Sequence, residues 1–169
     1  MKIFLLSTVL SWLLVSPAFS LQINDPAPFF SLHDSTDSDF FMSSYIGKMR
    51  TQPVKGIIIN FFASYCKPCR HELPVLNSLV EELKKKGIEV VIIGFDEDFD
   101  HVLRLLDEIG VDKPIILADM YGKVGEKYGV RYLPTTFFLD ADGRVKYIIR
   151  GELPDFEKVI RQQVEKLLQ

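Results

Sequence analysis

The sequence predicts one α/β domain built on a mixed β-sheet with helices on both faces. A strand–helix–strand pattern over residues 57–95 requires two parallel strands. A later pair of strands joined by an Asp-Gly turn requires antiparallel ones. The 169 residues correspond to about one domain. With 47% hydrophobic and 25% charged residues, the composition is that of a globular protein with a core.

The first twenty residues have the pattern of an export signal. Lys2 supplies a positive charge, residues 3–15 are mostly apolar, and small residues precede a predicted cleavage site after Ser20. The apolar run is shorter than the roughly twenty residues that a spanning helix needs. We therefore predict a signal peptide over residues 1–20 and a folded domain over 21–169, with an uncleaved N-terminal membrane anchor as the alternative. Both place the domain in the periplasm or another extracytoplasmic compartment.

An N-terminal extension is predicted over residues 21–56. Within it, residues 29–32 and 40–42 are rich in aromatic residues and can pair as a short hairpin across the polar loop 34–39.

The central strand is predicted over Ile57–Phe62, which is apolar on both faces except at Asn60. A helix follows over Cys66–Lys86 and ends at Gly87. Apolar positions recur along it at three- and four-residue steps: Cys69, Leu73, Leu76, Val80 and Leu83. Ile88–Phe95 is a second buried strand, parallel to the first.

A central αβ insert is predicted next. It consists of a helix over Asp98–Ile109 and a short strand over Ile115–Leu117. Asp119 is expected to be the N-cap of a further helix that runs to Tyr128 and is stopped by Gly129.

The chain is expected to finish with a hairpin and a helix. Thr135–Leu139 and Val145–Ile149 flank the Asp-Gly turn and are predicted to be antiparallel. Asp155 is placed to cap the last helix. The apolar positions predicted to face inward from that helix are Phe156, Val159, Ile160, Val164 and Leu167.

The two cysteines, Cys66 and Cys69, lie where the central strand gives way to a helix. Two cysteines are too few for a disulfide scaffold or a four-cysteine zinc site, and a bridge closing so short a loop would add only roughly 2 kcal/mol. Unpaired backbone N–H groups and the helix dipole favour a thiolate at Cys66, and Lys67 adds a positive charge. Pro68 loses nothing in the first turn, where its missing N–H had no helical partner. We therefore predict thiol–disulfide exchange, in which Cys66 attacks and the more buried Cys69 resolves.

Other site chemistry is not indicated. No metal site and no bound cofactor are predicted. The formal net charge of −3 leaves no basic footprint for nucleic acid.

Two segments carry a family resemblance. Asn60–Pro74, with its Cys-Lys-Pro-Cys, resembles the active-site segment of the TlpA/ResA-like branch of the thioredoxin superfamily. Tyr128–Asp140 resembles the segment around the cis-proline of that family, and Asp25–Phe29 is a weaker match at the entry to the domain. The resemblance covers nearly all of the chain beyond residue 20. It implies a thioredoxin-like fold and an extracytoplasmic thiol-disulfide oxidoreductase, a class in which many members are reductants in cytochrome c maturation.

The resemblance also implies roles for individual residues. Pro134 corresponds to the cis-proline that faces the dithiol and presents the backbone of Leu133 to a substrate; the alternative is an ordinary trans turn proline. Tyr65, Lys67 and Pro68 flank the reactive cysteine and are implied to contact the substrate.

Glu72, three residues after Cys69, can lie on the same helix face. In this family an acid here is proposed to handle protons near the thiols. The alternative is a solvated glutamate early in a helix. The sequence departs from classical thioredoxins in carrying Asn60 where they have a buried acid, and Tyr65 replaces the usual Trp.

A reductant of this class needs a disulfide-containing protein substrate, of which apocytochrome c is one candidate. It also needs a membrane thiol-disulfide electron donor. Two other functions compete. A peroxiredoxin-like peroxidase would be expected to have a Pro and a Thr before its cysteine, but residues 63–65 are Ala-Ser-Tyr. A copper-delivery module would usually space its cysteines one residue wider.

Overall fold

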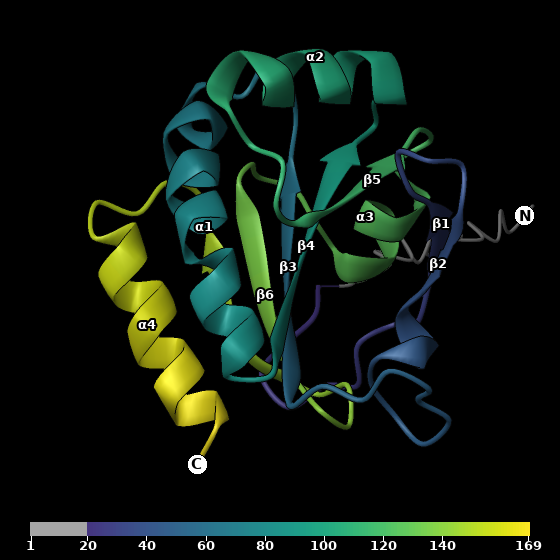
Figure 1. Cartoon of the computed structure of the whole chain (residues 1–169), viewed down its shortest axis with the longest axis vertical. Helices are drawn as coiled ribbons and strands as arrows, with labels where there is room; N and C mark the ends of the chain where they lie inside the picture. The colour runs from purple at the N-terminus through teal and green to yellow at the C-terminus, as the bar shows by residue number, and fades with distance from the viewer. Residues whose placement is uncertain (1–19) are drawn as a thin grey trace, which may run out of the picture.

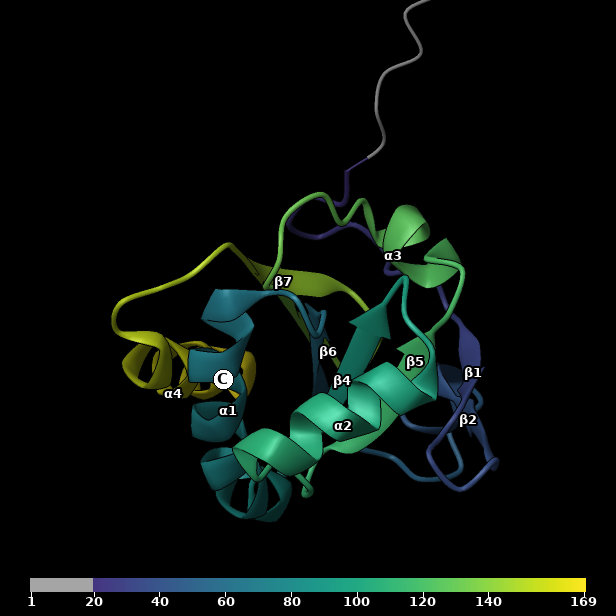
Figure 2. The ribbon, with the colours of Figure 1, turned by 90° about the horizontal axis from the view of Figure 1, so that it is seen from above.

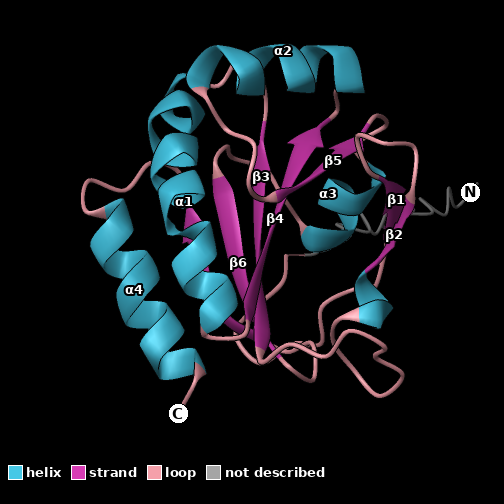
Figure 3. Cartoon of the chain, in the orientation of Figure 1, coloured by secondary structure: helices cyan, strands magenta, loops and turns pink. Residues whose placement is uncertain are grey.

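The computed structural model describes residues 20–169, so the predicted signal peptide, apart from Ser20, lies outside the described residues. The strands are β1 (Ser31–His33), β2 (Asp39–Phe41), β3 (Gly56–Phe62), β4 (Ile88–Phe95), β5 (Ile115–Asp119), β6 (Thr135–Asp140) and β7 (Val145–Arg150). The helices are the 3-10 turn η1 (Met42–Ser44), α1 (Lys67–Lys85), α2 (Phe99–Ile109), α3 (Lys123–Tyr128) and α4 (Phe156–Leu167). Figures 1 and 3 show the sheet at the centre of the molecule with helices around it.

The main sheet has the strand order β5-β4-β3-β6-β7. β3 is parallel to β4, and β4 is parallel to β5, whereas β6 is antiparallel to both β3 and β7. Every residue of β3 is buried, as expected for a central strand covered on both faces. The predicted mixed sheet is therefore confirmed, and the α2–β5 unit of the predicted insert forms its outer edge.

Two apolar layers enclose the sheet. On one face, α1, α2 and α4 pack through buried side chains that include Leu76, Leu105 and Ile160. On the other face, α3 and the N-terminal segment pack around Tyr128 and Met42. Figure 2 shows this division, with α1 and α4 side by side and the β1–β2 hairpin beyond β5. The helices thus lie on both faces, as predicted.

The predicted N-terminal hairpin is confirmed with a small shift in its boundaries. β1 and β2 are antiparallel, with Leu32 opposite Phe40, and Met42 begins η1 instead of extending the strand. An isolated bridge between Asp34 and Leu117 joins the hairpin to β5. The hairpin therefore covers what would otherwise be an open sheet edge.

Two details of helix capping differ from the predictions. Asp119 is the last residue of β5 and not an N-cap; Gly122 occupies that position with φ of 63°. The Asp119 carboxylate still accepts the Gly125 N–H at 2.9 Å, so it caps the helix from the strand end. Asp155 is the N-cap of α4, but its side chain makes no capping hydrogen bond.

Candidate active site

Strand pairing brings distant parts of the chain to one edge of the sheet. The parallel strands β3 and β4 end at the same edge. Because β6 is antiparallel to β3, with Phe61 opposite Thr135, the beginning of β6 lies at that edge too. Thr135 is in turn opposite Arg150, the last residue of β7. The cysteine pair, Pro134 and the end of β7 therefore meet there, although they are far apart in sequence.

Cys66 is the N-cap of α1 and forms a disulfide with Cys69. The Cys69 backbone N–H donates to Cys66 Sγ at 3.3 Å, so the sulfur occupies the place of a capping oxygen. When the disulfide is reduced, this N–H and the helix dipole favour a thiolate at Cys66. Cys69 is completely buried and Cys66 is 6% exposed, which agrees with the predicted order of accessibility.

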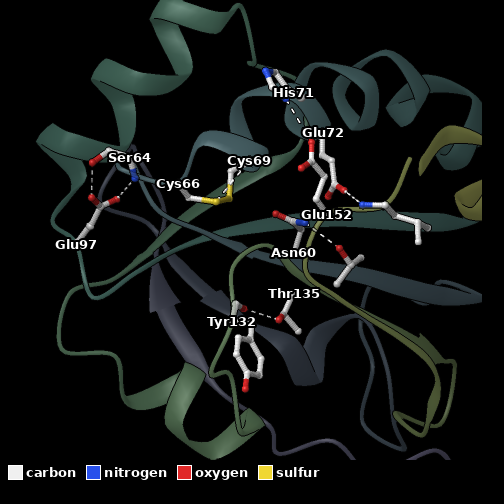
Figure 4. The surroundings of a disulfide bond; sticks show 12 residues. Asn60, Ser64, Cys66, Cys69, His71, Glu72, Glu97, Tyr132, Thr135 and Glu152 are labelled. Atoms are coloured by element: carbon white, nitrogen blue, oxygen red, sulfur yellow. Dashed lines mark hydrogen bonds and ion pairs between the residues drawn. A yellow bond between two sulfur atoms is a disulfide. The ribbon is translucent and has the colours of Figure 1, made fainter. Parts of the chain in front are cut away.

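The loop before Cys66 is held by a carboxylate that the sequence reasoning missed. Glu97 accepts the Ser64 backbone N–H at 2.7 Å, and its other oxygen accepts the Ser64 hydroxyl. Figure 4 shows this pair beside the disulfide. Glu97 follows β4 as Ser64 follows β3, so the predicted parallel pairing could have placed them together. The bidentate contact fixes the backbone two residues before the reactive sulfur.

The peptide bond between Leu133 and Pro134 is cis, as the family resemblance implied. The Pro134 carbonyl accepts the Gly151 N–H at 2.8 Å, and the Thr135 hydroxyl donates to the Tyr132 carbonyl at 2.6 Å. These bonds secure the loop from both sides and leave Leu133 half-buried.

Glu72 is buried, with 4% exposure, so the alternative of a solvated glutamate is wrong. Its Oε1 accepts the Leu153 N–H at 2.9 Å, whereas its Oε2 has no hydrogen-bond partner. Burial raises the pKa of Glu72 to about 7; the Leu153 N–H opposes this rise, and the charge of Glu152 adds to it. The carboxyl group therefore exchanges its proton near neutral pH.

A groove open to solvent runs past the disulfide. Tyr65 and Tyr132 stand on it with 72% and 66% exposure. The described residues that line it also include Pro68 and Leu133, together with three cations and no carboxylate. The three cations are Lys67, Arg131 and Arg150. Sequence reasoning named the residues next to the cysteines and the proline but missed Tyr132 and both arginines. Pairing of β6 with β7 was the available signal for Arg150.

Two absences can be stated for residues 20–169. None of the helices there combines the length and apolar character needed to cross a bilayer. Nor do three His, Cys, Asp or Glu side chains of this part of the chain group together in a way that could hold a metal ion.

A cysteine pair capping a helix, next to a cis-proline on a thioredoxin-like sheet, defines a thiol-disulfide oxidoreductase. The chain belongs to the AhpC/TSA family, whose model matches residues 23–148, and to the ResA-like thiol-disulfide oxidoreductases.

Three relatives illustrate this membership. The thiol-disulfide oxidoreductase ResA of Geobacillus thermodenitrificans is 32% identical over 148 residues, 88% of this chain and 79% of the relative. ResA of Geobacillus kaustophilus is 34% identical over 134 residues, 79% of this chain and 72% of the relative. A crystal structure of a putative thiol:disulfide interchange protein DsbE from Chlorobium tepidum has a TM-score of 0.78 and 28% identity, covering 89% of this chain and 100% of the other. The family and the fold that the sequence predicts are thus confirmed.

Proposed function

We propose that the protein is an extracytoplasmic reductant of disulfides in partner proteins. The Cys66 thiolate attacks one sulfur of the substrate disulfide, forms a mixed disulfide and releases the first substrate thiol. The Cys69 thiol then loses its proton and attacks Cys66 Sγ, which releases the second substrate thiol. The substrate gains two electrons, and the protein is left with the Cys66–Cys69 disulfide. The observation that carries this order is Cys66 Sγ at the helix N-terminus with the buried Cys69 behind it.

Glu72 is proposed to handle the proton of Cys69. It lies one helical turn beyond Cys69 and is buried, and its pKa of about 7 allows it to gain or lose a proton at neutral pH. As Cys69 becomes a thiolate, Glu72 takes up the proton that the thiol loses. The unpartnered Oε2 is free to carry it.

The groove is proposed to bind the substrate segment that contains the disulfide. The backbone of Leu133, presented by Pro134, is available to an extended peptide, and Tyr65 and Pro68 offer apolar contact. Because the lining carries positive charges without a carboxylate, we expect acidic residues beside the substrate cysteines.

The export pattern of residues 1–20 supports an extracytoplasmic location. The Cys66–Cys69 disulfide of a reductant in that compartment must be reduced again by a membrane thiol-disulfide donor, because no glutathione pool keeps thiols reduced there. Apocytochrome c is proposed as a substrate on the family resemblance.

Reduced protein is expected to reduce insulin and an apocytochrome c with a disulfide. Its reduction potential is expected near that of thioredoxin, about −270 mV. Equilibration with glutathione or dithiothreitol buffers measures the potential. A potential near −120 mV, typical of an oxidase, would overturn the reductant assignment. Peroxide consumption and Cu(I) binding by the same sample test the two competing functions; rapid peroxide turnover or tight copper binding without disulfide reduction would replace the proposal.

Reversing the charge of the groove is expected to invert its substrate preference. In a Lys67→Glu, Arg131→Glu double variant, kcat/KM should fall by about fivefold or more for a disulfide peptide with acidic flanks, and rise for a basic one. The wild-type preference should weaken as salt is added. Lys166→Glu makes half of this charge change in the last turn of α4, away from the groove, and serves as the control for charge reversal outside the groove. Equal kcat/KM values for both peptides in the wild type would contradict the expected acidic substrate.

A further inference from the structure

Asn60 carries one of two buried side-chain polar atoms without a hydrogen-bond partner in residues 20–169; the other is Glu72 Oε2. Asn60 is 1% exposed, and its unpartnered atom is Oδ1. A buried acceptor without a donor is destabilising, because the loss of its hydrogen bonds to water is not offset inside the protein. Such a cost in the central strand, six residues before Cys66, calls for a physical explanation.

The direction of the Asn60 amide is set by its neighbour in the sheet. Asn60 Nδ2 donates to Thr136 Oγ1 at 2.8 Å, and the two residues are opposite each other in the β3–β6 ladder. Thr136 is two residues after Pro134, so the Asn60–Thr136 hydrogen bond lies close to the cis-proline. With the nitrogen used in this way, Oδ1 is on the other side of the amide. In Figure 4 that side faces the disulfide.

The disulfide has no hydrogen to offer to this oxygen. Reduction adds two electrons and two protons and converts the pair into two thiols. The S–H group is a weak donor. Cys69 is completely buried, so water does not provide an acceptor for its thiol. Reduction therefore turns Cys69 into a buried S–H donor, and Asn60 Oδ1 faces the cysteine pair.

We propose that Asn60 Oδ1 accepts a hydrogen bond from the Cys69 thiol in the reduced protein. The acceptor is unsatisfied in the disulfide form and satisfied in the dithiol form, so Asn60 shifts the redox equilibrium toward the dithiol. An amide oxygen accepts the bond without taking the proton. Asn60 therefore stabilises the protonated thiol of Cys69 by a hydrogen bond, and Glu72 is the group that takes up its proton. The inference rests on the Cys66–Cys69 cycle of the proposed function but not on the identity of the substrate.

The redox equilibrium tests this inference. In glutathione buffers, the protein disulfide and two glutathione molecules form the protein dithiol and one glutathione disulfide. In Asn60→Ala the equilibrium constant is expected to move about tenfold toward the protein disulfide, which corresponds to about 30 mV. A constant within twofold of the wild-type value would overturn the proposal.

Asn77→Ala is the matched control. Asn77 is also a buried asparagine, but its amide is satisfied by the Gly110 carbonyl and by the N–H groups of Asp112 and Lys113. This variant should lose stability without moving the redox equilibrium. If Asn77→Ala moved it as far as Asn60→Ala, loss of stability would explain both changes and the proposal would fail.

A spectroscopic measurement tests the bond in a protein that keeps Asn60. In Cys66→Ala the thiol of Cys69 is the single S–H group of the chain, since the sequence has two cysteines. Its infrared stretching band is expected at lower frequency than that of an unbonded thiol, and it should move back up in Cys66→Ala, Asn60→Ala. A band already at the unbonded position would refute the proposal even if Asn60→Ala did not fold. Neither experiment uses a protein substrate, so failure to reduce insulin would count against the proposed function alone.

Discussion

Replacing Cys69 with alanine is expected to stop turnover at the mixed disulfide. The Cys66 thiolate should still attack a substrate, because its N-terminal position on α1 does not depend on the Cys69 sulfur. Release then has to wait for an external thiol. Well-oriented intramolecular groups reach effective concentrations of about 10⁵ M or more, so turnover should fall by at least about 10³-fold. Non-reducing electrophoresis and mass spectrometry should detect the covalent complex with insulin or a disulfide peptide.

Cys66→Ala is the natural comparison. It should lose turnover as well, but without forming a complex, because Cys69 is completely buried and cannot reach a substrate. The two variants together test the order of the steps. A stable complex with Cys66→Ala and none with Cys69→Ala would reverse the assignment of attacking and resolving thiols.

Glu72→Gln is expected to make the protein more stable at alkaline pH and to flatten its stability–pH curve. Burial raises the pKa of Glu72 from 4.5 to about 7, so between these values the folded state binds more protons than the unfolded state. Wild-type stability should therefore fall as pH rises from about 4.5 to about 7 and stay low above that. The full loss is on the order of 3 kcal/mol. Glutamine keeps an acceptor for the Leu153 N–H without the charge.

Urea unfolding of the oxidised proteins from pH 4 to pH 8.5 measures this difference. Glu152→Gln is the control, because Glu152 is exposed and contributes less to the shift than burial does. A difference between wild type and Glu72→Gln that stays constant over the whole pH range would mean that Glu72 titrates normally. Alkylation of Cys66 in the same variant examines the proton role: loss of a nearby carboxylate should shift its pH dependence to lower pH.

Most of the scaffold could be predicted from the sequence, because strands buried on both faces are continuous apolar runs and helices show a regular apolar spacing. The run Ile57–Phe62, the periodic helix after it and the Asp-Gly hairpin could each be read from local pattern. The prediction that Asp119 is an N-cap is wrong, because a carboxylate can accept a helix N–H from the end of a strand as well as from the capping position. Local pattern does not distinguish the two.

The site was only partly predictable for a related reason. The two-residue spacing of Cys66 and Cys69 at the start of a helix predicts thiol–disulfide exchange, and the family resemblance identified Pro134. The burial of Glu72, in contrast, is produced by the segment around Leu153, which is remote in sequence. The contact of Ser64 with Glu97 and the direction of the Asn60 amide likewise depend on neighbouring strands. Such features follow from tertiary packing and cannot be seen in a short window of sequence; of the three, only the contact of Ser64 with Glu97 could be inferred from the predicted pairing of β3 with β4.

The pairing of β3 with β6 holds the cysteine pair, which follows β3, next to Pro134, which precedes β6. The site therefore depends on the register between these two strands. Material inserted between β4 and β6 lengthens the chain without moving the two halves of the site apart, and the α2–β5 unit is such an addition. The α2–β5 unit and the hairpin that covers it therefore lie at one edge of the sheet, away from the β3–β6 ladder. A slip of one residue within β6 would instead turn Thr136 to the opposite face and separate it from Asn60. Insertions are thus expected to be tolerated at the β5 edge of the sheet, whereas a change of register between β3 and β6 is not.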